Sequence, residues 1–210
     1  MNTVAESILS DQSLKAGSSF YLRDDVVKVA KDLLGKILVT NFDALTAVRI
    51  TETEAYKDIT DKASHAFGGR KTKRNEIMYA SGGTAYIYLC YGVHSLFNVV
   101  TNKAGIPDAV LIRAGEPVFG LESMLKRTGK SKPSFSLTAG PGNLSKALGI
   151  HYKDSGLDLL GNAIYVVDDG ETVHPKNIIS TPRVGVDYAG EDAFRPYRFY
   201  IKNSSFISKK

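Results

Sequence analysis

Hydrophobic residues recur at helical spacing in three parts of the chain. The first predicted helix starts at Asp24, which can cap its N-terminus, and extends to about Leu34, where Gly35 can end it. The same spacing predicts a helix from Glu116 to Arg127, ended by Gly129, and a shorter one from about Asn143 to Leu148. Each of these helices has one apolar face and is therefore expected to pack on a core.

Strands are predicted where β-branched and aromatic residues cluster. Lys36 to Thr40 and Ala47 to Tyr56 form a first pair. The longest run, TAYIYLCYGVHSLFNVVT, contains two apolar stretches that meet at Tyr91 and Gly92. Because glycine readily takes the positive φ of a tight reversal, this run predicts a hairpin with Tyr91 near its tip. Shorter strands are predicted from Asp108 to Arg113, around Ala163 to Val167 and around Arg198 to Lys202.

These elements do not follow the regular rhythm of parallel βαβ units, which indicates an α+β fold. The chain has 210 residues, near the upper end of the roughly 100 to 200 expected for one domain, and contains no repeat or low-complexity linker. We therefore predict a polar N-terminal arm over residues 1–18, a single domain over residues 19–207 and a basic tail over residues 208–210.

Composition narrows the expected cellular setting. Hydrophobic residues make up 43% of the chain, and no apolar run approaches the roughly 18 residues of a membrane span. The first twenty residues lack both a basic leader and a continuous apolar core, so no signal peptide is expected. Cys90 is the single cysteine, which excludes an internal disulfide and multi-cysteine metal sites. We expect a soluble cytoplasmic protein in which Cys90 is buried, with a nucleophilic role for Cys90 as the alternative.

The net charge of +5 suits a surface that binds phosphates, although many basic proteins never contact nucleic acid. Four cations lie in the segment GGRKTKRNE, namely Arg70, Lys71, Lys73 and Arg74. They could flank a nucleic-acid backbone or form a solvated loop. The helix start after AGPGN offers backbone N–H groups to an anion, and could equally be an ordinary helix start.

Candidate chemistry begins in the segment ITETEAY. Strand alternation places Ile50, Glu52, Glu54 and Tyr56 on one face. A carboxylate beside an aromatic ring is either a solvated surface residue or a positioned base, and the spacing does not choose between Glu52 and Glu54. His65 follows closely and could join them or serve as a hydrogen-bonded structural residue. The remaining histidines show no metal-ligand spacing with it, so no metal is expected.

The predicted hairpin is rich in tyrosine. Tyr86 and Tyr88 share a face by alternation, whereas Tyr91 at the turn could project beyond the sheet. In nucleic-acid chemistry, one such ring can stack on an extruded base while another fills the gap that the base leaves. The alternative is plain packing, which is common for tyrosine in strands.

The segments ETEAY, ASHAFGGRKTKRN, GTAYIYLCYG and VLIRAGEP, with Asn98 between the last two, closely resemble the alkyladenine (3-methylpurine) DNA glycosylase family in content and order. The resemblance extends from roughly Asp25 to Ser205. It implies a curved antiparallel sheet with surrounding helices, similar to the C-terminal domain of formyltransferases, that bends DNA and carries the hairpin into its minor groove. It also implies a monomer that needs no cofactor, acts on damaged double-stranded DNA, and works in the nucleoid of a bacterium or the nucleus of a eukaryote.

The resemblance further implies roles in catalysis and base recognition. Glu54 would activate the attacking water, and Arg113 would help to hold that water. Tyr56 and Tyr88 would stack on the flipped base. The remaining base contacts would come from His65, at the base edge, and Asn98, which would test what is attached to the purine.

Contacts to the rest of the DNA are implied as well. Tyr91 would intercalate in place of the flipped base, and Arg70, Lys71, Lys73, Arg74 and Asn143 would contact the backbone. Asn143 departs from the family, because several relatives have a lysine there, which puts one phosphate contact in doubt. The stretch between Tyr56 and His65 also differs among relatives, so the preferred lesion does not transfer from the resemblance.

Alkylation leaves a purine cationic and a good leaving group, so aromatic faces can favour it while a carboxylate supports charge growing on the sugar. The expected substrates are 3-methyladenine, 7-methylguanine, hypoxanthine and ethenoadenine. Three alternatives remain: a non-catalytic nucleic-acid-binding module of the same fold, a bifunctional glycosylase and lyase that uses a lysine Schiff base, and an acyl or formyl transfer enzyme.

Overall fold

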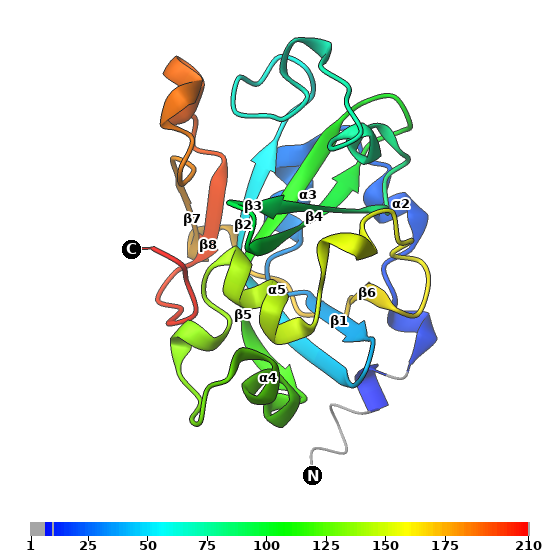
Figure 1. The fold of residues 1–210 in the computed structure, drawn as a ribbon, viewed down its shortest axis with the longest axis vertical. Helices are drawn as coiled ribbons and strands as arrows, with labels where there is room; N and C mark the ends of the chain where they lie inside the picture. Colours follow the sequence, from blue (N-terminus) through cyan, green and yellow to red (C-terminus); the bar gives the residue numbers. More distant parts are fainter. Residues whose placement is uncertain (1–6, 10, 210) are drawn as a thin grey trace.

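An antiparallel sheet of eight strands forms the centre of the computed structural model, which describes residues 7–9 and 11–209 (Figure 1). Six strands lie in the order β3-β4-β5-β2-β1-β6, and the antiparallel pair of β7 and β8 joins them through β2. The strands are β1 (Ile37–Asn41), β2 (Leu45–Tyr56), β3 (Ala85–Cys90), β4 (His94–Thr101), β5 (Asp108–Phe119), β6 (Ile164–Val167), β7 (Ile178–Thr181) and β8 (Arg198–Ile201).

Short helices connect these strands. The α-helices are α2 (Ser18–Tyr21), α3 (Val26–Asp32), α4 (Leu121–Thr128) and α5 (Pro141–Leu148). The 3-10 helices are η1 (Gln12–Leu14), η2 (Phe67–Gly69), η3 (Glu76–Tyr79), η4 (Phe135–Leu137), η5 (Tyr152–Asp154), η6 (Pro175–Asn177) and η7 (Asp187–Phe194). This mixture of one antiparallel sheet and several helices in a single unit confirms the predicted α+β class.

Strand alternation divides the side chains of β3, β4 and β5 between two environments. Ile87, Phe97 and Val110 point into the main hydrophobic core, where α3, α4 and α5 contribute their apolar faces. Tyr86 and Leu111, one position along their strands, instead line a pocket on the other side of the sheet. The connection from β2 to β3, residues 57–84, forms the top of the molecule in Figure 1 and covers this pocket side.

The helix predicted from Glu116 to Arg127 is wrong in its first part. Residues up to Phe119 continue β5, because β2 is long enough for Glu116 and Phe119 to pair with Arg49 and Ala47. The chain then turns at Gly120, where a Cβ atom would come within 2.4 Å of the Leu45 carbonyl oxygen. Helix α4 therefore starts only after this glycine, and it ends at Gly129 as predicted.

Two other predicted helix boundaries are corrected. Asp25, not Asp24, caps α3, because its side chain accepts a hydrogen bond from the backbone N–H of Lys28. Helix α5 begins at Pro141, not near Asn143, since proline is well suited to the first turn of a helix. The predicted strands and the hairpin are confirmed, whereas β7, a run of only four residues, was not predicted.

The chain ends are closely connected to the domain where the structure describes them. Within the predicted N-terminal arm, Leu9 and Ala16 are buried, while residues 1–6 and 10 lie outside the described residues. Within the predicted tail, Ser208 hydrogen-bonds Glu52, and residue 210 lies outside the described residues. The domain boundaries remain predictions. In residues 7–9 and 11–209, no helix is both long and apolar enough to span a membrane.

Candidate active site

A pocket of about 200 Å³ lies on the sheet face opposite the main core. Pockets for drug-sized ligands measure roughly 300–1,000 Å³, so this pocket is a small one. About half of the residues that line it are aromatic or polar. It includes the predicted residues Tyr56, His65, Tyr88, Tyr91, Asn98 and Arg113, together with Tyr86, Leu96 and the segment Val184, Gly185 and Val186.

A β-bulge orients the two glutamates of the ITETEAY segment. Ile50 pairs with Gly115 but Glu52 pairs with Ala114, so two positions on β2 oppose one on β5. As a result, Ile50 packs in the main core. The prediction that Ile50 shares a face with Glu54 is therefore wrong, because strict alternation cannot be extended through a bulge.

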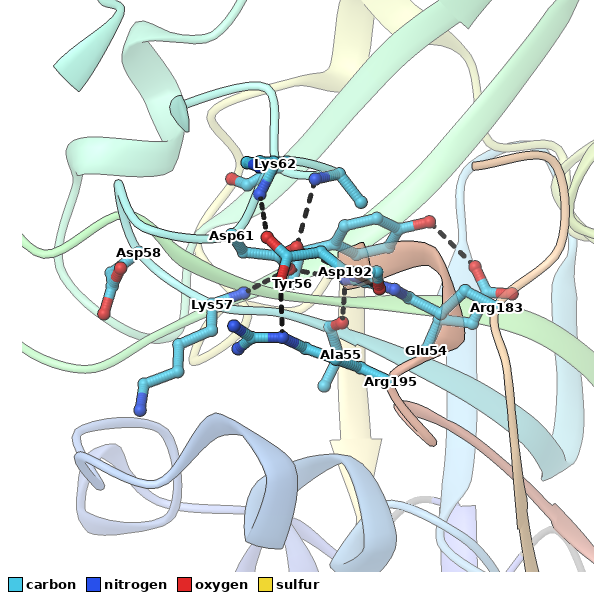
Figure 2. Close-up of polar contacts among 12 residues, drawn as sticks. Glu54, Ala55, Tyr56, Lys57, Asp58, Asp61, Lys62, Arg183, Asp192 and Arg195 are labelled. Carbon is cyan, nitrogen blue, oxygen red and sulfur yellow. Dashed lines mark hydrogen bonds and ion pairs between the residues drawn. The ribbon is translucent and has the colours of Figure 1, made fainter. Parts of the chain in front are cut away.

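Glu54 is completely buried, and both of its carboxylate oxygens have partners. Oε1 accepts a hydrogen bond from the backbone N–H of Val184 at 2.8 Å. Oε2 accepts one from the Tyr56 hydroxyl at 2.8 Å (Figure 2) and lies 3.3 Å from Nη1 of Arg113. Because Tyr56, Val184 and Arg113 all line the pocket, the carboxylate lies directly behind the pocket wall.

Glu52 has different surroundings and does not reach the pocket. Its Oε1 accepts hydrogen bonds from Nε of Arg198 at 2.6 Å and Nε of Arg113 at 3.1 Å. The backbone N–H and the hydroxyl of Ser208 complete its shell at 2.6 and 2.8 Å. Glu52 is thus a buried anion that anchors two arginines, a distinction from Glu54 that spacing alone could not make.

Arg113 connects the two glutamates and is itself buried. Burial disfavours its charge, but Glu54 and Glu52 outweigh this effect and raise the pKa of the guanidinium above its ordinary value. A permanent positive charge is therefore fixed at the pocket wall beside Glu54. Such a charge can orient a water molecule or an anionic oxygen.

Tyr56 presents its ring to the pocket and its hydroxyl to Glu54. Burial, followed by the charge of Glu54, raises the pKa of this phenol well above its ordinary value. The hydroxyl therefore stays protonated and keeps donating to Glu54. The ring contacts a second cation, because the Arg183 guanidinium lies 4.8 Å from its centroid.

His65, Tyr86 and Tyr88 form an aromatic cluster across the pocket. The rings of His65 and Tyr88 meet edge to face with centroids 4.6 Å apart, and His65 Nδ1 is 2.8 Å from the Tyr86 hydroxyl. Burial, followed by the charges of Arg74 and Arg70, lowers the pKa of His65 to about 4. The imidazole is therefore neutral at physiological pH.

Asn98 lies on the pocket floor, where it is 3% exposed. Its Nδ2 donates to the backbone carbonyls of Tyr86 at 3.1 Å and Leu96 at 3.2 Å, which fixes the orientation of the amide. Cys90 also lines the pocket and is half-buried rather than buried. Both side chains come from the strands of the predicted hairpin.

The hairpin turn carries Tyr91 outward. Tyr91 and Gly92 both have positive φ, at 51° and 73°, which confirms the predicted reversal at this pair. The Tyr91 side chain is 94% exposed, and Val93 beside it is 71% exposed. Two apolar side chains thus project into solvent at the hairpin tip, and Tyr91 also forms part of the pocket wall.

The basic segment, defined here as Arg70, Lys71, Lys73 and Arg74, is exposed beside the pocket. None of the ion pairs among the described residues involves it. A groove next to the pocket is lined by Arg70, Arg74 and Lys62, and it shares His65 and Tyr188 with the pocket. The cations therefore border a surface that is continuous with the pocket mouth.

Asn143 is the one predicted site residue that lies outside this arrangement. It is exposed in the first turn of α5, and its Nδ2 donates to the backbone carbonyl of Ala139 at 3.1 Å. It does not line the pocket or the adjacent groove. Its predicted role is limited to contact with a more distant part of a bound molecule.

Several residues in the pocket wall or directly behind it were not predicted from the sequence. Arg183 and Val184 contact Tyr56 and Glu54, and Tyr188 forms part of the pocket mouth. They lie in the segment TPRVGVDYAG, which has neither a clear strand pattern nor a charge cluster. Their buried partner Asp61 was likewise hidden in an apparently polar loop. Within the described residues, no group of three His, Cys, Asp or Glu side chains could hold a metal ion.

Comparison with known proteins gives consistent matches. The family model described as methylpurine-DNA glycosylase (MPG) matches residues 19–205. A protein of Methanocella arvoryzae is 48% identical over 192 residues, which cover 91% of this chain and 94% of that protein. Proteins of Desulfitobacterium hafniense and Bacillus cytotoxicus are 42% and 45% identical, over 93% of this chain and 99% and 100% of theirs. All three carry the name "Putative 3-methyladenine DNA glycosylase".

Proposed function

This chain belongs to the methylpurine-DNA glycosylase family, and we propose that it removes damaged purines from double-stranded DNA by hydrolysing the N-glycosidic bond. The names of its relatives support 3-methyladenine as a substrate. The proposed range also includes 7-methylguanine, hypoxanthine and ethenoadenine. A target base inside a duplex is inaccessible, so the damaged nucleotide is flipped into the pocket.

The observation that carries this proposal is the placement of Glu54. Its carboxylate is completely buried, lies directly behind an aromatic pocket and stands 3.3 Å from the Arg113 guanidinium. A carboxylate in this position can accept a proton from water and can stabilise positive charge that develops on the sugar. Arg113, which lines the pocket, offers a further contact to that water.

Water attacks C1′ of the sugar, and the electrons of the glycosidic bond leave with the base. Glu54 takes up a proton from this water. A cationic alkylated purine leaves as a neutral base, and the proton passes on to solvent; a neutral purine leaves as an anion and takes up one proton, so in both cases the products are a free base and an abasic strand. No metal or organic cofactor enters this scheme.

Tyr56 and Tyr88 provide aromatic faces for the flipped base, and a cationic alkylated purine gains cation–π attraction from them. His65 contributes an N–H or a lone pair at the base edge. Because its pKa is about 4, His65 is not an imidazolium at neutral pH and does not protonate a neutral lesion. Asn98 limits which substituents fit on the pocket floor.

The DNA itself is held outside the pocket. Tyr91 fills the space that the flipped base leaves, which suits its 94% exposure at the hairpin tip. The basic segment contacts phosphates beside the lesion. We propose that one copy of the chain suffices for this reaction.

A lyase step that proceeds through a lysine Schiff base is not favoured. Such a reaction needs a desolvated amine beside C1′, and no lysine is among the described residues that line the pocket. We therefore propose a monofunctional glycosylase that leaves the abasic strand uncut.

The test is single-turnover base release from duplexes that each contain one lesion, comparing wild type with Glu54→Gln. The amide keeps the side-chain shape but cannot accept a proton, so base release should fall by at least about 100-fold while DNA binding persists. Glu116→Gln is the matched control, because Glu116 is exposed on β5 and outside the pocket. Gels run with and without alkali score strand cleavage.

Two outcomes would overturn the proposal. If Glu54→Gln released bases at the wild-type rate, Glu54 would not be the base. If the wild-type protein bound DNA but released no base from any duplex, the chain would be a binding module. Strand cleavage without alkali would indicate a lyase.

A further inference from the structure

Arg183 is a buried cation that the proposed chemistry does not use directly. Its side chain and that of Asp61 are both 0% exposed, and they form a two-pronged ion pair with distances of 2.5 and 2.8 Å. Neither residue lines the pocket. Figure 2 shows this pair among the residues that surround Tyr56.

The Arg183 guanidinium joins three separate segments. Nη1 donates to the carbonyl of Ala55 at the end of β2 at 2.8 Å, and Nη2 donates to the carbonyl of Asp192 in η7 at 3.1 Å. Asp61 in turn accepts backbone N–H groups of its own loop from Lys57 and Ala63. The end of β2, the loop after it and η7 are therefore held at one point.

Two residues of the candidate active site, Tyr56 and Glu54, are in contact with Arg183 or with the residue that follows it. Arg183 contacts the Tyr56 ring at 4.8 Å without itself lining the pocket. The next residue, Val184, donates its N–H to Glu54. A movement of Arg183 would shift the support of the stacking ring and of the carboxylate together.

We propose that the Arg183–Asp61 pair is the positioning element that fixes Tyr56 and Glu54 relative to a bound purine. The inference rests on the proposed function, since it concerns the same pocket. Base release needs the carboxylate, the water and C1′ in line, and a misplacement of about 1 Å can lower a rate by about 100-fold. A planar guanidinium suits this task better than an ammonium, because it makes the forked contact and the ring contact at once.

The experiment removes the pair without leaving a buried charge unpaired. The double variant Arg183→Met/Asp61→Asn replaces the pair with neutral side chains of similar size, which buried sites often tolerate. Arg183→Lys keeps the charge but loses the fork. The matched control is Arg49→Met/Asp169→Asn, which removes a partly buried pair that is joined at 2.7 Å and whose members do not line the pocket.

The readout is the single-turnover rate constant of base release at saturating enzyme, measured beside the affinity for the same lesion duplex. Unfolded protein lowers the amount of active enzyme but not this rate constant, so a merely structural role would not change it. We expect the rate constant to fall by about 100-fold in the Arg183→Met/Asp61→Asn variant. Arg183→Lys should give an intermediate rate, and the Arg49 control should match wild type.

The possible failures are distinguishable. A wild-type protein that releases no base would overturn the proposed function itself. The proposed function stands if wild type is active and Glu54→Gln is inactive. If the Arg183→Met/Asp61→Asn variant then has the wild-type rate constant, only the positioning role is overturned. An equal loss in the Arg49 control would also overturn it, because the effect would not be specific to this pair.

Discussion

His65 is part of the aromatic cluster and lines one groove with Arg70 and Arg74, in surroundings that disfavour its charged form. Its folded-state pKa of about 4 is below the ordinary value of 6.5. Between these two values the unfolded chain binds a proton that the folded chain does not. The contribution of His65 to the free energy of unfolding therefore has its full value above pH 6.5 and is lost as the pH falls toward 4.

We expect the variant His65→Gln to show a weaker dependence of unfolding free energy on pH than wild type. The unfolding free energy that wild type loses through His65 between pH 6.5 and 4 should be on the order of 3 kcal/mol at most, and the variant should not show this loss. Urea denaturation at several pH values measures this difference. His174→Gln, at an exposed histidine, is the control and should keep the wild-type dependence. Parallel curves for wild type and His65→Gln would contradict the buried neutral state.

At the residue scale, the sequence allowed the pocket residues to be named but not their partners. The residues taken from the family resemblance, such as Tyr56 and Asn98, do meet at one pocket. The motif ETEAY could not distinguish Glu52 from Glu54, because the distinction depends on which arginines and backbone groups surround each carboxylate. Those groups come from parts of the chain without a local pattern.

At the element scale, the hairpin of β3 and β4 combines two functions. Its strands present Tyr86 and Tyr88 to the pocket, as alternation predicted, while its turn presents Tyr91 to solvent. The pairing of β3 with β4 is regular from Ala85 opposite Val99 to Cys90 opposite His94. The turn therefore has a fixed position relative to the pocket. A substitution of Tyr91 therefore tests the proposed DNA contact at the tip while it leaves Tyr86 and Tyr88 in place.

Tyr91→Ala should weaken binding to lesion duplexes by about 10- to 100-fold, since stacking of a base on an aromatic side chain contributes roughly 1–3 kcal/mol. Thermal unfolding of the free protein should be unchanged, because the side chain is 94% exposed. Fluorescence anisotropy with labelled duplexes gives the affinity. Leu160→Ala, at an exposed apolar side chain outside the pocket, serves as the control. Equal affinities of wild type and Tyr91→Ala would remove Tyr91 from the DNA interface.

Elements with a regular period were predictable, and those shaped by their neighbours were not. The hairpin and α3 follow from local patterns. The extension of β5 to Phe119 arises from pairing with the long strand β2, and the bulge beside Glu52 arises from the same pairing. Both depend on a partner strand that is not adjacent in sequence, so no local period reveals them.

At the scale of the whole molecule, the exposed basic segment lies at the end that carries the pocket mouth. Each cation that neutralises a phosphate should contribute about 0.9 to the slope of log Kd against log salt concentration. Replacing Lys71 and Lys73 by Gln should therefore lower that slope by about 2. Titrations at several salt concentrations measure it.

The control for this experiment is Lys132→Gln. Lys132 is exposed in the loop after α4, at the opposite end of the molecule from residues 57–84 in Figure 1. Its removal should leave the slope as in wild type. If the loss of both Lys71 and Lys73 left the slope unchanged, the basic segment would be a solvated loop that makes no phosphate contacts.

The bonds that complete the candidate site join residues that are very distant along the chain. Glu54 and Val184 are 130 positions apart, Asp61 and Arg183 are 122 apart, and Glu52 and Ser208 are 156 apart. Contacts between such distant residues require the closure of large loops, and we expect them to form late in folding. A partly folded chain could already contain the hairpin and its basic neighbours, and so hold DNA, but it would lack the assembled carboxylate and its supports. Binding and base release are thus expected to arise at different stages of folding, with release restricted to the fully native protein.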